Sequence, residues 1–172
     1  LLAIYDKDDN LIKRFEYANS RMPISMTQGP VKYYLHYDQI GSLRAVSDTN
    51  HNIIKEITYD TYGNILSDSN ESFKVPFGFA GGLYDSDTGL NRFGYRDYDS
   101  YTGKWTAKDP IDFSGGDSNL YGYVLNDPVN FIDPTGEMAW LGRIVWAVMT
   151  WAAMDGDPET KTTRPLDQSN QR

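Results

Sequence analysis

Four Asp-Pro pairs carry the residue type in this chain that is best suited to chemistry. They stand at residues 109–110, 127–128, 133–134 and 157–158, so Asp109 and Asp133 lie 24 residues apart. Two carboxylates held close together can divide the roles of acid and base, because they cannot both ionise cheaply. Asp-Pro is also a common way to open a turn. Spacing alone therefore leaves a catalytic and a structural interpretation open.

The composition predicts that turns and strands, rather than helices, position these residues. The 172 residues include 19 Asp but only 5 Glu, together with 15 Gly, 13 Tyr and 8 Pro. Asp, Gly and Pro favour turns, while Tyr favours strands. Alternations of apolar and polar residues at 32–37, 42–46 and 52–59 predict strands. The expected fold class is mainly β.

Charge and the rarest residue types exclude several functions. The net charge of −8 argues against a nucleic-acid partner, because binding a phosphate backbone requires a basic face. The absence of Cys excludes disulfides and a cysteine nucleophile, and two His argue against a histidine-built metal site. The acidic stretch that begins at Asp85 lacks the Gly and Glu that a helical calcium loop needs. We therefore expect no metal and no cofactor.

A strand-turn-strand repeat organises the first part of the chain. Tyr37-Asp38 is followed by Gly41, and Tyr59-Asp60, 22 residues later, is followed by Gly63. Asp nucleates a turn through its own backbone and Gly supplies a positive φ. An earlier, degenerate copy begins at Tyr5-Asp6, with Asn10 assigned to the Gly position. Such units need stacked neighbours, and because Leu1 to Ile4 resembles the inside of a strand, we expect a segment of a longer polypeptide.

The pattern of these residues resembles that of the YD repeats of Rhs proteins, and residues 79–137 resemble the Rhs repeat-associated core domain. The stretches that carry the second resemblance are 79–85, 88–90, 94–99, 102–105, 109–111, 119–123 and 126–136. They include Asn-Leu-Tyr-Gly-Tyr at 119–123 and Asp-Pro-Thr-Gly at 133–136. The resemblance divides the chain into YD-type repeats at 1–78, the core end at 79–137 and a variable C-terminal extension at 138–172.

The resemblance implies a β-strip that is a fragment of a hollow shell and ends in an inward-turning plug. In this family the shell encloses the C-terminal extension, often a toxin, and many members cut themselves between core and extension. By analogy, Asp109 and Asp133 would form an aspartic-protease-like pair that acts once in cis. The cut would fall between Glu137 and Met138, where the charge and the hydrophobic period of the sequence also change.

Two residues depart from the pattern of self-cutting members. Glu137 stands where those members usually carry Leu, and an extra carboxylate near the pair would add repulsion. Lys108 stands where related toxin-complex proteins more often have Arg. Lysine keeps the positive charge but lacks the planar guanidinium, which can bind a carboxylate through two hydrogen bonds. Arg96 could pair with a carboxylate inside the shell, and Asp127 could support the site, although a turn role is the simpler interpretation.

The extension is expected to contain one apolar helix at about 138–154 and a disordered tail. The helix carries a single charge, Arg143, and should be buried inside the shell or against a partner. Its length is marginal for a membrane span, so a membrane-active peptide carried by the shell is one alternative. A non-catalytic binding or adhesion module is another. The resemblance further implies export or delivery into a target cell, with the rest of the shell, a delivery system and an immunity protein as partners.

Overall fold

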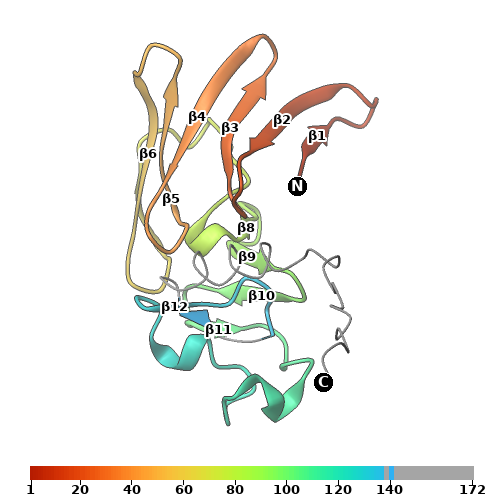
Figure 1. The fold of residues 1–172 in the computed structure, drawn as a ribbon, viewed down its shortest axis with the longest axis vertical. Coiled ribbons are helices and arrows are strands. Elements are labelled where there is room, and N and C mark those ends of the chain that lie inside the picture. Colours follow the sequence, from red (N-terminus) through yellow and green to blue (C-terminus); the bar gives the residue numbers. More distant parts are fainter. Residues whose placement is uncertain (138–139, 142–172) are drawn as a thin grey trace, which may run out of the picture.

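The computed structural model describes residues 1–137 and 140–141. An antiparallel sheet of seven strands forms the upper part of the molecule, with each strand paired to the next along the chain (Figure 1). Its strands are β1 (Ala3–Tyr5), β2 (Leu11–Tyr17), β3 (Pro23–Gln28), β4 (Val31–Tyr37), β5 (Leu43–Asp48), β6 (Ile53–Tyr59) and β7 (Ile65–Asp68). The three strands expected at 32–37, 42–46 and 52–59 are therefore confirmed, as β4, β5 and β6.

Shorter elements form the lower part of the molecule. They are the 3-10 turns η1 (Phe79–Gly81), η2 (Asp112–Gly115) and η3 (Val124–Asn126), and the strands β8 (Leu83–Tyr84), β9 (Leu90–Phe93), β10 (Arg96–Asp99), β11 (Lys104–Trp105), β12 (Phe131–Ile132) and β13 (Trp140–Leu141). The order β11-β10-β9-β8 makes one antiparallel sheet, and β12 pairs with β13 (Figure 1). No α-helix occurs in the described part of the chain, which confirms the mainly β class.

One turn design, built on Asp, recurs at both ends of the large sheet. The Oδ1 atom of Asp60 accepts hydrogen bonds from the backbone N–H groups of Tyr62 and Asn64, both at 2.9 Å. The same pair of bonds, two and four residues on, is made by Asp6, Asp38 and Asp48. Glu would be too long for this geometry, which explains why Asp dominates the acidic residues.

The residue three positions after each of these aspartates adopts a left-handed conformation. It is Gly at 41 and 63 but Asp9, with φ 61°, and His51, with φ 66°, in the other two turns. The assignment of Asn10 to the Gly position was therefore wrong, because Asp9 occupies it. Asn10 instead donates a side-chain hydrogen bond to the Oδ2 atom of Asp6 at 2.9 Å.

Two hydrophobic clusters hold the molecule together. The first lies on one face of the large sheet and includes Met26, Leu43 and Val46, all fully buried. The second is aromatic and belongs to the lower part; its buried rings are Phe79, Phe93, Tyr98, Trp105 and Tyr123. Gly63 has a φ of 92° and a Cβ there would overlap the Phe79 ring, so this turn of the large sheet packs directly on the second cluster.

Part of the expected C-terminal helix is replaced by strand. Trp140 and Leu141 pair with Ile132 and Phe131, because β12 offers a free edge and bulky apolar residues suit strands. The remainder of the helix expected at 138–154, and the tail, lie outside the described residues. Within residues 1–137 and 140–141 no helix is long and apolar enough to cross a membrane.

Candidate functional site

Two chain segments carry Asp109 and Asp133 toward one another in the lower part of the molecule. Asp109 lies beyond β11, and its N–H donates to the carbonyl of Leu120 at 2.9 Å, which ties the segment in place. Its Oδ1 atom accepts the Ile111 N–H at 2.9 Å and so opens the following turn. Asp133 directly follows β12 and is 2 % exposed. The sequence places both residues before proline, and the fold makes them neighbours.

Arg96 on β10 joins the two carboxylates. Its Nη2 atom lies 2.9 Å from Oδ2 of Asp109 and 3.3 Å from Oδ2 of Asp133, and the arginine side chain is 3 % exposed. The Oδ2 atoms of Asp109 and Asp133 therefore lie close together, because both face the same nitrogen of Arg96. The sequence interpretation, in which one carboxyl donates a proton and the other accepts one, did not include the buried cation that lies against both of them.

The other contacts of Arg96 fix its position. Its Nε atom donates to the carbonyl of Gly136, and its Nη1 atom to that of Leu120 at 3.4 Å. The guanidinium lies 4.3 Å from the centre of the Trp105 ring, a cation-π contact that shields one face from water. Arginine has five N–H donors and can bind two carboxylates and two carbonyl groups at once, whereas lysine could not make all of these contacts.

Asp133 holds the backbone that leads to the expected cleavage point. Its Oδ1 atom accepts hydrogen bonds from Thr135 Oγ1 at 3.2 Å, from the Gly136 N–H at 2.9 Å and from the Glu137 N–H at 3.2 Å. Backbone donors of this kind stabilise the ionised carboxylate. The residue whose peptide bond is expected to be cut is thus bound directly by one of the two aspartates.

The segment 133–137 is also clamped onto the turn between β9 and β10. The Tyr95 N–H donates to the carbonyl of Thr135 at 2.9 Å. Gly136 has a φ of 73°, and a Cβ on it would overlap the Phe93 carbonyl, while a Cβ on Gly94 would overlap the Thr135 carbonyl. Only glycine allows the two backbones to approach this closely. Residues 133–137, on the N-terminal side of the expected cut, are therefore part of the folded core.

A small cavity opens between these groups. It has a volume of about 20 Å³, enough for one water molecule, and its walls include Arg96, Asp109, Gly115, Asp133 and Glu137. Tyr123 packs nearby, and burial raises the pKa of its phenol well above the usual value, so the ring stays neutral. The cavity is therefore bounded by four carboxyl side chains, those of Asp109, Asp117, Asp133 and Glu137, and by one fixed cation, and it has room for a single water.

Several predicted residues are placed elsewhere. Lys108 forms an exposed ion pair with Asp112 at 2.6 Å, and that hydrogen bond raises the pKa of the lysine. Asp127 accepts hydrogen bonds from Asn130 and is a turn residue. Met138 lies outside the described residues.

The sequence interpretation missed two features of the site. Arg96 was considered only as a possible support, although it is the group to which both carboxylates bind. Gly115, a wall of the cavity, was not considered at all. The pair of adjacent glycines at 115–116 is the sequence signal that could have revealed it. Among the described residues, no group of three or more His, Asp or Glu side chains is arranged to hold a metal ion.

Comparisons with known proteins agree with this architecture. The family model described as teneurin YD-shell matches residues 1–129. The chain is 34% identical to the tRNA3(Ser)-specific nuclease WapA of Bacillus spizizenii over 141 residues, which covers 79% of the chain and 6% of that protein. It is 38% identical to teneurin-3 of Danio rerio over 116 residues, which covers 62% of the chain and 4% of that protein.

Solved structures show the same fold. The crystal structure of TcdB2-TccC3 without its hypervariable C-terminal region matches with a TM-score of 0.58 at 30% identity, over 72% of this chain and 6% of that one. The complex TcdB2-TccC3-Cdc42 matches with a TM-score of 0.59 at 28% identity, over 80% of this chain and 6% of that one. The chain thus spans only about a twentieth of the length of the proteins that it matches.

Proposed function

Because the chain belongs to the teneurin YD-shell family, within the Rhs and YD-repeat shell proteins, we propose that it is the terminal strip of a shell that encloses its own C-terminal segment. We further propose that the shell cuts the peptide bond between Glu137 and Met138. One observation carries the second proposal: Asp109, Asp133 and the backbone at 136–137 meet around the single guanidinium of Arg96.

Each group takes a separate role in this reaction. Asp109 accepts a proton from water, whose oxygen bonds to the carbonyl carbon of Glu137. Asp133 holds the N–H groups of Gly136 and Glu137, and Arg96 compensates the negative charge that gathers in the site. The bond between the carbonyl carbon of Glu137 and the nitrogen of Met138 then breaks, and the proton passes from Asp109 to that nitrogen. The products are a carboxyl group on Glu137 and an amino group on Met138.

Tethering supplies the substrate without a separate binding step. The close contact of Gly94 and Gly136 with the facing backbones fixes the chain next to the carboxylates. Such positioning lowers the activation barrier for cleavage, because the reacting groups have already lost their freedom of motion when the chain folds. Residues 138–172 are the segment that would be released. Similarity to the WapA proteins, which are named tRNA nucleases, supports a toxin-related role for the shell. Export or delivery to another cell, with a delivery system and an immunity protein as partners, belongs to this proposal.

Intact-mass measurement of the 172-residue chain tests the cleavage. We expect a split after Glu137, and its loss in Asp109→Asn and Asp133→Asn. Asp127→Asn is the matched control, because Asp127 also precedes a proline but lies in an exposed turn. Cleavage in water labelled with oxygen-18 should place one labelled oxygen in the new carboxyl group. A wild-type chain that stays whole would leave the module with a binding or adhesion role only.

A further inference from the structure

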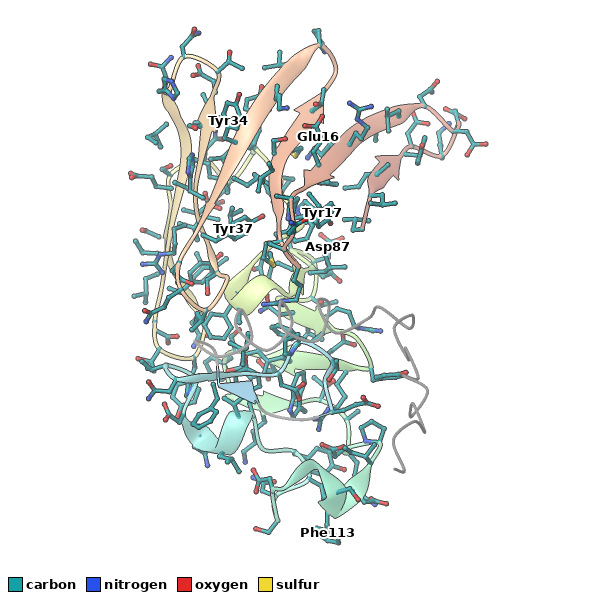
Figure 2. The ribbon with its side chains drawn as sticks, in the orientation of Figure 1. Glu16, Tyr17, Tyr34, Tyr37, Asp87 and Phe113 are labelled. Carbon is teal, nitrogen blue, oxygen red and sulfur yellow. The ribbon has the colours of Figure 1, made fainter. Side chains whose placement is uncertain are left out.

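Gly115 occupies an unusual place in the candidate site. The segment after Asp109 folds back on itself, with Asp112 N–H donating to the Asp109 carbonyl and Ser114 N–H to that of Ile111, both at 3.2 Å. This tight turn, η2, carries Phe113 outward to the tip of the molecule, where it is 69 % exposed (Figure 2). It also carries Gly115 back over the carboxylate of Asp109.

The missing side chain of Gly115 points into the gap between base and substrate. A Cβ at this position would lie 2.9 Å from Oδ2 of Asp109 and 2.9 Å from the carbonyl oxygen of Glu137. The two oxygens are therefore separated by at most twice that distance. The cavity with room for one water has Gly115 in its wall. A methyl group, about as large as a water molecule, would compete for this space.

Backbone conformation does not explain why position 115 is a glycine, as a comparison with the neighbouring Gly116 shows. Gly116 has a φ of 86° and open space around its Cα, so it serves the backbone turn. Gly115 has no positive φ, and its surroundings, not its backbone, are what a side chain would disturb. The two adjacent glycines are thus required for different physical reasons, which makes them a matched pair for an experiment.

We propose that Gly115 is a positioning residue for the cleavage reaction: by lacking a side chain, it admits the attacking water between the Asp109 carboxylate and the carbonyl of Glu137. This inference rests on the proposed cleavage and adds a requirement to it. The water would donate one hydrogen to Asp109 while its oxygen faces the carbonyl carbon, and the wall formed by η2 would keep a second water out.

The test compares Gly115→Ala with Gly116→Ala in the 172-residue chain. We expect Gly115→Ala to slow cleavage by about 100-fold, the size of effect that a misplacement of about 1 Å can cause. Gly116→Ala should cleave within about threefold of the wild-type rate, although its thermal midpoint falls because alanine tolerates that φ poorly. Equal cleavage rates for Gly115→Ala and the wild type would overturn the inference and leave the cleavage itself intact.

A pH profile separates positioning from general damage. The methyl group would exclude water from the Asp109 carboxylate, and desolvation disfavours the charged form, so the acidic limb of the residual rate should move to higher pH. A slower rate with an unmoved limb and a lowered thermal midpoint would mean a structural role and overturn the inference. A wild-type chain that does not cleave would instead refute the proposed function.

A second measurement decides the matter if Gly115→Ala does not fold or its residual rate is too slow to profile. In a crystal structure of the uncut Asp133→Asn chain, Asp109 and Gly115 are both retained. We expect one ordered water within hydrogen-bonding distance of Asp109 Oδ2 and of the Glu137 carbonyl, in contact with the Cα of Gly115. A dry gap there would overturn the inference.

Discussion

Replacing Arg96 by methionine should destabilise the fold strongly and in a pH-dependent way. Methionine keeps an unbranched, flexible stem but removes the charge that faces both Asp109 and Asp133. Unit charges about 3 Å apart attract by about 5 kcal/mol at an effective dielectric constant of about 20. Much of that gain repays the cost of burial, so the relevant figure is the penalty of leaving buried carboxylates without a counter-ion, about 3 to 5 kcal/mol.

The sign of the pH dependence follows from proton linkage. Without the guanidinium, two buried negative charges lie close together, and the native variant relieves this by holding more protons than the unfolded chain. The free energy of unfolding of the variant then falls as pH rises, over the pH range in which its native state binds more protons than its unfolded state. The loss caused by Arg96→Met should therefore be largest near pH 7.5 and should shrink by at least about 1 kcal/mol by pH 4.5.

Urea unfolding followed by tryptophan fluorescence measures this loss, with the wild type and the variants compared at the same extent of cleavage as judged by intact mass. Arg92→Met is the control, because Arg92 lies on the adjacent strand β9 and pairs with Asp97 in an exposed setting; it should cost no more than about 1 kcal/mol. The double variant Arg96→Met, Asp109→Asn should recover part of the loss. A loss that is the same at pH 4.5 and 7.5 would refute the argument from buried charge.

Two further predictions concern residues that the local pattern singles out. Glu137→Leu should speed cleavage by about tenfold, because Glu137 lines the cavity together with both aspartates and its removal would relieve about 1.4 kcal/mol of repulsion. Glu137→Gln removes the charge but keeps the size of the side chain. A slower rate for both variants in the intact-mass assay would contradict the reasoning. His51→Gly should raise the free energy of unfolding by about 0.5 to 1 kcal/mol, because His51 adopts a φ of 66° in an exposed turn; an unchanged urea midpoint would show that the histidine is not strained.

The repeats could be predicted from the sequence because their physics is local. Each turn is made by an aspartate that binds backbone groups two and four residues away, and each strand follows from alternating residue types. The one local error, Asn10 for Asp9, came from expecting glycine at the left-handed position. The turn at Asp48 escaped notice for the same reason, because His51 occupies that position.

The site could be predicted only in part, because its geometry is not local. The resemblance pointed to Asp109 and Asp133, but the sequence does not show that Arg96, 37 residues before Asp133, lies against both. That contact depends on how β10, the segment between β11 and η2, and the residue after β12 come together. Lys108 illustrates the converse, since it adjoins Asp109 in sequence but pairs with Asp112 on the surface.

The structural turn of the repeats and the candidate site share one design. Like Asp60, Asp133 binds the N–H of the residue four positions on, and Gly136 takes the left-handed position that Gly63 takes in the repeat. In the repeat, the side chain of Asn64 also donates to Oδ2 of Asp60, at 2.8 Å.

At the site, the residue that corresponds to this asparagine is Glu137, whose side chain lacks the amide N–H donor of asparagine. The Oδ2 atom of Asp133 instead accepts from Arg96 at 3.3 Å. A similar exchange occurs at Asp38, where the fourth residue is Ser42 and Oδ2 lies 4.0 Å from Arg44. A turn that lacks the asparagine thus leaves one carboxylate oxygen to a more distant partner. At Asp133 that partner is the guanidinium that also binds Asp109, so this turn is joined to the candidate site.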